Sequence, residues 1–303
     1  MRGPILQMDC SCEPAARCAR KNVARAKRPQ RIHTMPNRID QKFADLHAAG
    51  KSGFIAYITA GDPSLAATEQ LVPALEAAGV DILELGVPFS DPLADGVVNQ
   101  MAAQRALDAG ATIAKLFESI RRIRAKSELP LVLFTYLNPL YVHGFDKFHE
   151  EAAAAGIDGI LILDLPPEEI DANRELTDKH RMKSIRLIAP TTPPARMERI
   201  CKSADGFIYY VSREGVTGEQ TKLSDSIGAQ VAEIKKHTDL PVAVGFGIST
   251  PDQAAEVARS ADAVVVGSAI VRRIAEHGRD ADLAGKVASF VAPLAGAAHS
   301  AKR

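Results

Sequence analysis

From residue 36 onward the chain repeats one pattern: a short apolar run, a break rich in Gly and Pro, and then a helical stretch. Helical patterns such as "AATEQLVPALEAAG" and "TPDQAAEVARSA" separate the apolar runs. Near-continuous apolar strands that alternate with helices are typical of a parallel sheet whose outer face is covered by helices. The pattern predicts eight strands, at residues 53–59, 81–85, 131–136, 159–163, 184–189, 206–211, 241–246 and 262–267.

Eight strand–helix units in a body of about 250 residues are typical of a single (β/α)₈ TIM barrel of the α/β class. We expect this barrel to form one catalytic domain over residues 35–303. The stretch "PNRIDQKFADLHAAGKSG" precedes the first strand and predicts an extra N-terminal helix. The alternative is an open doubly wound sheet, which usually has fewer strands and would carry a dinucleotide fingerprint that this sequence lacks.

Residues 1–34 differ from the rest of the chain, because they hold eight Lys and Arg against only Asp9 and Glu13. They contain no apolar region of the kind found in secretory signals. We expect a disordered basic extension, which would also result from a start codon placed too far upstream. An organelle transit segment is the alternative, since such segments are rich in Arg and poor in acids.

The composition excludes some classes of partner and location. The chain has 37 basic and 37 acidic residues, so no overall charge attracts nucleic acid or an anionic membrane. No run approaches the roughly 18 apolar residues of a membrane span. Only Cys201 lies in the body, which favours a reducing compartment. We therefore expect a cytoplasmic protein, or an organelle stroma if residues 1–34 are a transit segment.

In a (β/α)₈ barrel the reacting groups lie at the carboxyl ends of the strands. The seventh predicted strand ends in "VGFGIS" and the eighth in "VVVGSAI", which also begins a helix. Gly247, Gly267 and Ser268 there would present backbone N–H groups at helix N-termini, which favour an anion. Two such neighbouring ends predict a phosphate site, although Gly ends many strands and Ser caps many helices.

The stretch "DILELGVPFSDPLADG", which begins with the second predicted strand, holds the most informative acid. Strand alternation places Ile82 and Glu84 on one face and two Leu on the other, so Glu84 should point into the barrel. Burial there raises the pKa of a carboxyl group and suits it to acid–base work near neutral pH. The alternative is a buried Glu paired with a structural cation. Asp91 and Asp95 follow in a Pro-rich loop, where acids usually form turns, and one of them could face a substrate.

Two absences restrict the reaction. No predicted strand ends in Lys, which disfavours a Schiff base to the substrate. No His, Asp or Glu set at the strand ends has the spacing of metal ligands, so no metal site is expected. The sequence therefore predicts proton transfer by carboxylates acting on a phosphorylated substrate.

Five motifs resemble the tryptophan synthase α-subunit family: "LELGVPFSDPLADG", "YITAGDP", "SREGVTG", "GFGIS" and "GSAI". They occur in the order typical of that family, over about residues 36–298. The resemblance implies a (β/α)₈ lyase that cleaves indole-3-glycerol phosphate to indole and glyceraldehyde 3-phosphate. It implies no cofactor in this chain. Val97 stands where the family usually has Pro.

The resemblance also assigns roles to residues. It implies that Glu84 performs the acid–base chemistry, that Asp95 stabilises charge at the indole nitrogen, and that Tyr209 lies near the reacting carbon. The sixth loop, "SREGVTGEQTKLSD", would be a lid whose Thr217 reaches Asp95 on closure. The phosphate site would contain Gly218, Gly247, Gly267 and Ser268, and the indole pocket Tyr57, Tyr136, Leu161 and Phe246. Tyr57 stands where the family commonly has Phe, and for these aromatic residues plain core packing is the alternative.

The family works with a β subunit that carries pyridoxal phosphate, in an α₂β₂ heterotetramer. The resemblance implies that Pro88, Asp91, Asn138 and Pro166 contact this partner, with Asp91 on the surface. Three alternatives remain open. They are a stand-alone lyase, a barrel that only binds and activates the β subunit, and another phosphate-binding barrel such as an isomerase. Intact Glu84 and Asp95 disfavour the second, and "LADG" disfavours the third.

Overall fold

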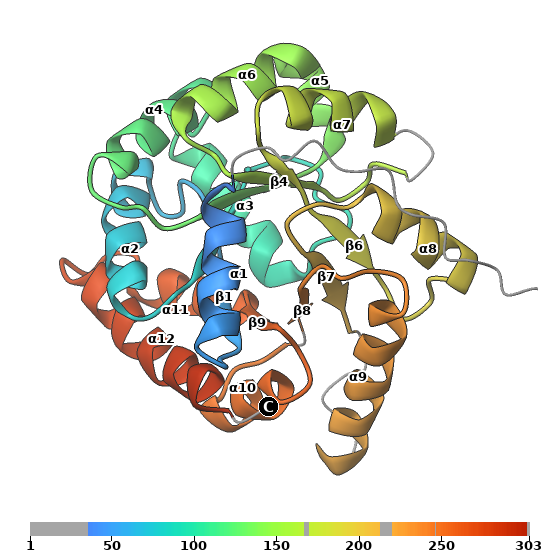
Figure 1. Cartoon of the computed structure of the whole chain (residues 1–303). Coiled ribbons are helices and arrows are strands. Elements are labelled where there is room, and N and C mark those ends of the chain that lie inside the picture. Colours follow the sequence, from blue (N-terminus) through green and yellow to red (C-terminus); the bar gives the residue numbers. More distant parts are fainter. Residues whose placement is uncertain (1–35, 167–169, 213–219, 246, 302–303) are drawn as a thin grey trace, which may run out of the picture. The chain divides into compact units, whose positions relative to one another are not determined.

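The computed structural model describes residues 36–166, 170–212, 220–245 and 247–301. Within these residues a parallel sheet has the strand order β5-β4-β3-β2-β1-β9-β8-β7-β6, and helices surround it (Figure 1). The strands are β1 (Gly53–Thr59), β2 (Ile82–Gly86), β3 (Leu131–Thr135), β4 (Gly159–Ile162), β5 (Lys183–Ser184), β6 (Arg186–Ile188), β7 (Ile208–Val211), β8 (Val242–Gly245) and β9 (Ala263–Val266). The predicted (β/α)₈ barrel is confirmed.

The fifth predicted strand, residues 184–189, is divided in two at Ile185. Its first part, β5, pairs with β4, and its second part, β6, pairs with β7. The amide of Ile185 still donates to the carbonyl of Ile160 in β4, at 3.0 Å. The divided strand therefore bonds to β4 at one end and to β7 at the other, which closes the sheet into a barrel.

Helices pack against the outer face of the sheet, as the alternating pattern predicts. The outward-facing strand residues Phe54, Leu83, Leu133 and Val264 join one large buried cluster with apolar residues of the helices. The helices after the first are α2 (Leu65–Ala77), α3 (Val97–Asp108), α4 (Ile113–Arg124), α5 (Leu137–His143), α6 (Phe145–Ala155), α7 (Ile170–Lys179), α8 (Pro194–Ser203), α9 (Gln220–Lys235), α10 (Pro251–Ala258), α11 (Ser268–His277) and α12 (Leu283–Ser300).

The predicted extra helix is present as α1 (Arg38–Ala48), and it covers the amino-terminal end of the barrel. Asn37 caps it, because the Asn37 side chain accepts from the backbone while Asp40 bonds back to the amide of Asn37. Ile39, Phe43 and Leu46 of α1 are buried in the same cluster as the inward-facing strand residues. Full burial of such a side chain contributes about 1.5–3 kcal/mol, so these contacts hold α1 firmly against the barrel.

Two glycines at the amino-terminal strand ends make room for α1. A Cβ on Gly159 would approach the Cδ1 of Ile39 to 3.0 Å, and a Cβ on Gly53 would approach Leu46 to 2.9 Å. The small residues at these strand ends therefore allow α1 to lie close to the sheet.

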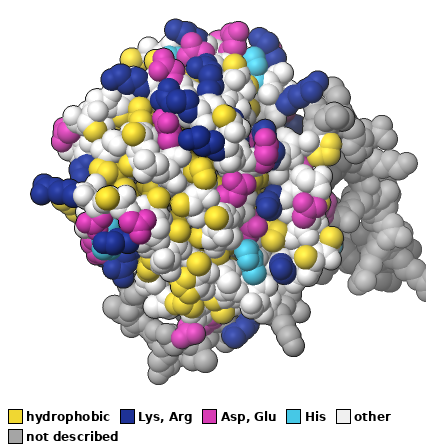
Figure 2. Space-filling view, turned by 90° about the vertical axis from the view of Figure 1, so that its left-hand side faces the viewer, with side chains coloured by type: hydrophobic (Ala, Val, Ile, Leu, Met, Phe, Trp, Pro, Cys, Tyr) yellow, Lys and Arg dark blue, Asp and Glu magenta, His cyan; other side chains and the backbone are white. Residues whose placement is uncertain are grey.

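Charged side chains of both signs lie among hydrophobic ones on the face shown in Figure 2. This agrees with the balanced composition of the chain. No helix within the described residues is long and apolar enough to cross a membrane. Residues 1–35 lie outside the described residues, so the prediction for the basic extension stays untested.

Candidate active site

Glu84 points into the barrel, as strand alternation predicts. Its neighbour Ile82 belongs to the interior cluster, whereas Leu83 and Leu85 belong to the cluster between sheet and helices. In the sheet, Glu84 lies beside Tyr57 of β1 on one side and Val132 of β3 on the other. The side chain therefore lies near the carboxyl end of β2, inside the ring of strands.

The Glu84 carboxyl group is fully buried and has no hydrogen-bond partner for either oxygen among the residues that the structure describes. Within those residues, therefore, no cation pairs with Glu84, and the alternative of a structural ion pair finds no support there. Burial raises the pKa of Glu84 to about 8, because the charged form loses its hydration. The group is mostly protonated at pH 7 and exchanges a proton at a pH close to neutral.

Three aromatic rings from different strands lie near Glu84. Tyr57 of β1 meets Phe134 of β3 edge-on with ring centroids 5.2 Å apart, and Phe134 meets Tyr209 of β7 at 6.4 Å. Burial raises the pKa of both tyrosines, and the nearby Glu84 adds to the effect. Both hydroxyls therefore stay neutral. Their rings give the inner wall a flat apolar surface that suits an aromatic substrate.

Two glycines accommodate these rings. A Cβ on Gly86 would overlap the Tyr57 hydroxyl, and a Cβ on Gly245 would overlap that of Tyr209. The ends of β2 and β8 must therefore lack side chains for the tyrosines to fit.

Asp95 is held by a tyrosine that directly follows the next strand, β3. The Tyr136 hydroxyl donates to Asp95 Oδ2 at 2.9 Å and accepts from the amide of Ala94 at 3.0 Å. Asn99 Nδ2 lies 3.5 Å from the other carboxylate oxygen. Burial raises the pKa of Asp95, and the bonds from Tyr136 and Asn99 oppose this rise. Asp95 is thus a half-buried and oriented carboxyl group.

The structure describes part of the predicted phosphate end. Gly267 is the N-cap of α11, and Ser268 is its first residue. The amides at the very start of a helix have no carbonyl one turn earlier to bond to, so they can bind an anion. In α11 the amide of Ile270 already donates to the Gly267 carbonyl at 2.8 Å, which leaves the amides of Ser268 and Ala269 for this role. Gly247 follows β8 with φ +54°, a left-handed conformation that favours glycine, and a Cβ there would meet open space.

The other predicted site residues are distributed as follows. Leu161 in β4 is buried in the interior cluster. Asp91 is exposed and accepts from the Ser90 hydroxyl at 2.6 Å. Asn138 is exposed near the start of α5, shortly after β3, and Pro88 and Pro166 are half-buried. Thr217, Gly218 and Phe246 lie outside the described residues.

Sequence reasoning missed Phe134, Gly86 and Gly245. Phe134 could have been found from alternation, because Val132 two residues earlier faces inward. The two glycines give no such signal, since the rings that they accommodate come from neighbouring strands. Among the described residues, no group of three or more His, Cys, Asp or Glu side chains is placed to hold a metal ion.

Comparison with known proteins gives one consistent result. The family model described as "Tryptophan synthase alpha chain" matches residues 43–298. The curated tryptophan synthase alpha chain of Geobacter sulfurreducens is 48% identical over 258 residues, which cover 85% of this chain and 97% of that protein. The protein of the same name from Opitutus terrae is 51% identical over 241 residues, or 80% of this chain and 91% of that protein.

Solved structures agree with these sequence matches. The crystal structure of tryptophan synthase subunit alpha from Legionella pneumophila str. Paris superposes with a TM-score of 0.80 at 39% identity. The match covers 86% of this chain and 98% of that one.

Proposed function

The chain belongs to the tryptophan synthase alpha chain family, lyases that cleave indole-3-glycerol phosphate in tryptophan biosynthesis, and from this premise we propose that Glu84 and Asp95 carry out the cleavage. The observation that carries the proposal is the Glu84 carboxyl group. It is fully buried at the end of β2, has no partner among the described residues, and has a pKa of about 8.

The cleavage needs both an acid and a base, and Glu84 acts as each in turn. In its neutral form it donates a proton to C3 of the indole ring, which makes the ring an iminium ion. The resulting carboxylate then removes the proton from the glycerol hydroxyl next to the C3–carbon bond. That bond breaks as the aldehyde forms, its electron pair returns to the ring, and Glu84 regains its proton.

Asp95 stabilises the intermediate. Protonation at C3 leaves positive charge on the ring nitrogen, and a carboxylate that accepts the ring N–H lowers the energy of that state. The bond from Tyr136 at 2.9 Å keeps the carboxyl group oriented before the substrate arrives. We assign Asp95 this electrostatic role.

The remaining predicted residues bind the substrate. Tyr57, Leu161 and Tyr209 enclose the indole ring and the reacting carbon, with Tyr136 behind them. Gly247, Gly267 and Ser268 hold the phosphate through backbone and hydroxyl groups. Phe246 and Gly218 add to these pockets, and Thr217 reaches Asp95 when the sixth loop closes, as the family resemblance implies.

Membership of the family implies a β-subunit partner. We propose an α₂β₂ heterotetramer in which Pro88, Asp91, Asn138 and Pro166 contact that partner. Leu93 is 92% exposed and Val142 is 81% exposed, so large apolar side chains lie near these residues in the sequence and face solvent in the isolated chain. The α reaction needs no cofactor here, because pyridoxal phosphate belongs to the β subunit. The cytoplasmic location stays a prediction.

The proposal is tested by indole release from indole-3-glycerol phosphate, with and without the β subunit. Glu84→Gln keeps the shape of the side chain but cannot exchange a proton, so we expect kcat to fall by about 10²-fold or more. Glu69→Gln is the control, because Glu69 lies on α2 in a surface ion pair with Arg122. Wild-type turnover by the Glu84 variant would exclude it as the acid–base group.

A further inference from the structure

Arg186 is a buried cation that the reaction does not use. It lies in β6 between Ile185, which faces the barrel interior, and Leu187, so its side chain points outward into the helical layer. Only 5% of Arg186 is exposed, and its Nε and Nη2 have no hydrogen-bond partner within the described residues. A buried and unpaired charge is costly unless something compensates it.

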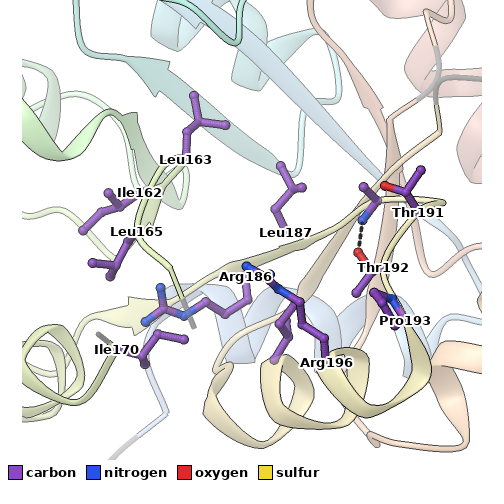
Figure 3. Close-up of a pocket in the computed structure, with 12 residues that line it drawn as sticks. Ile162, Leu163, Leu165, Ile170, Arg186, Leu187, Thr191, Thr192, Pro193 and Arg196 are labelled. Carbon is purple, nitrogen blue, oxygen red and sulfur yellow. Dashed lines mark hydrogen bonds between the residues drawn. The ribbon is translucent and has the colours of Figure 1, made fainter. Parts of the chain in front are cut away.

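The side chain lines a cavity of about 270 Å³ between the ends of β4 and β6 and the helices α7 and α8. Figure 3 shows the Arg186 side chain extending toward Ile170 and Leu165, while Arg196 extends from α8 toward Arg186. The cavity therefore has a cationic part and an apolar part. Its lining residues are Ile162, Leu163, Leu165, Ile170, Arg186, Leu187, Ala189, Thr191, Thr192, Pro193, Arg196 and Ile200.

The charges around the cavity favour an anion. Burial lowers the pKa of Arg186 to about 10, and the positive charge of Arg174 on α7 adds to this effect, so Arg186 remains charged at neutral pH. Arg174 itself pairs with Asp178 at 3.6 Å. The Nε and Nη2 groups of Arg186 bond to no carboxylate within the described part of the chain.

A hydroxyl donor completes the polar part. Thr192 Oγ1 accepts from the amide of Ala189 at 3.0 Å, which is the bond drawn in Figure 3. A hydroxyl that accepts in this way keeps its own proton to donate. Thr192 therefore presents an oriented O–H donor on the wall that it shares with Arg196.

We propose that this cavity is a second ligand site, which binds a small organic phosphate or carboxylate through the free N–H groups of Arg186. The apolar part of the ligand packs against Ile162, Leu165 and Ile170, and Arg196 and Thr192 contact its oxygens. The site is separate from the phosphate end of the active site, because its residues come from β4, β6, α7 and α8 rather than from β8, β9 and α11.

Isothermal titration calorimetry of the full chain with phenyl phosphate tests the proposal. We expect two classes of site in the wild type, one at Gly267 and one at Arg186. Arg186→Met removes the donors with little change in volume and should weaken one class by at least about tenfold, since hydrogen bonds to charged groups contribute that much. Gly267→Val should weaken the other class. Arg199→Gln is the control, because Arg199 is exposed on α8, as Arg196 is, but does not line the cavity.

Inorganic phosphate is the second probe, and it separates the polar from the apolar contribution to binding affinity. It should bind the Arg186 site more weakly than phenyl phosphate, because it has no apolar part. Arg196→Gln changes an exposed residue and should also weaken this class, so the test does not depend on one buried substitution. Phosphate should raise the melting temperature of the wild type more than that of Arg186→Met. Equal binding and equal stabilisation in wild type and Arg186→Met would overturn the proposal, as would a single class of site that Gly267→Val abolishes.

Discussion

At the scale of single residues, Glu84 combines a cost in stability with a gain in reactivity. Its carboxyl group would ionise near pH 4.5 in the unfolded chain but has a pKa of about 8 in the folded one. The protein therefore holds a proton at pH 7 that solvent would remove. In the proposed mechanism this proton passes to the indole ring, and no group within the described residues bonds to the carboxylate that it leaves.

The pH dependence of catalysis follows from this. Glu84 must begin each turnover in its neutral form, so kcat/KM should decrease as the pH rises through about 8. Steady-state indole release measured from pH 6 to pH 10 gives this profile. A kcat/KM that stays constant across that range would contradict the neutral starting form.

The raised pKa of Glu84 should also make the stability of the fold depend on pH. Because the folded-state pKa is raised, the unfolded state releases its proton first, and folding stability falls as the pH rises from about 5 to about 8. Relative to Glu84→Gln, the wild type should lose about 3 kcal/mol over this range. Urea unfolding of both proteins at several pH values measures the difference. A difference that is independent of pH would show that Glu84 ionises normally.

Substitutions distinguish the contribution of Asp95 to kcat from that of Tyr136. Asp95→Asn removes the negative charge and should lower kcat by about 10²-fold. Tyr136→Phe keeps Asp95 but removes its orienting bond, so a smaller loss of about tenfold is expected. Tyr141→Phe is the matched control, because Tyr141 is 60% exposed. Equal losses in the Asp95 and Tyr136 variants would mean that the two act as one unit.

The sequence predicts the orientation of a single side chain, but it does not predict contacts between side chains from different strands and helices. Alternation within one strand depends only on neighbours in the chain, so the inward orientation of Glu84 could be predicted. The contacts of Phe134 with two rings, the room left by Gly86, and the isolation of Arg186 depend on how neighbouring strands and helices pack. These features became visible only in three dimensions.

At the scale of elements, the predicted helix before the first strand and the run of strands are present because local patterns specify them. The cap of α1 by Asn37 is an example, since all of its groups lie within four residues. The division of the fifth strand at Ile185 was not predicted, because it reflects the pairing of β5 with β4 and of β6 with β7. Helix α5 begins shortly after β3, and Asp164 stabilises its start by accepting from the amide of Leu137 at 2.7 Å.

The start of α11 provides a test at this scale. Gly267→Val would bring methyl groups near the amides that we assign to the phosphate, and a Cβ at this position already lies 3.4 Å from Tyr57 Cβ. We expect KM to rise strongly while the melting temperature falls less, because the nearest atom to a Cβ at Gly267 lies at an ordinary van der Waals distance. Gly296→Val in α12 is the control, since a Cβ there meets nothing within 4 Å. A sharp fall in melting temperature with an unchanged KM would argue against the phosphate site.

At the scale of the whole molecule, the stand-alone lyase and the α₂β₂ complex make different predictions. If the β subunit contacts Asn138, then Asn138→Arg should reduce activation by the β subunit while basal indole release stays at the wild-type level. Glu118→Arg on α4 adds the same side chain at an exposed position outside the proposed interface. Titrating each variant with the β subunit while recording indole release tests the assignment. Unchanged activation by Asn138→Arg would remove this residue from the interface.

The position of α1 has a further consequence for the fate of the product. Ile39, Phe43 and Leu46 of α1 pack against the inward-facing strand residues and cover the amino-terminal end of the barrel interior. If cleavage takes place beside Glu84 as proposed, we expect indole to leave at the opposite end, where we place the second subunit. A β subunit bound at that end, as proposed, would therefore receive indole directly, before the product reaches bulk water.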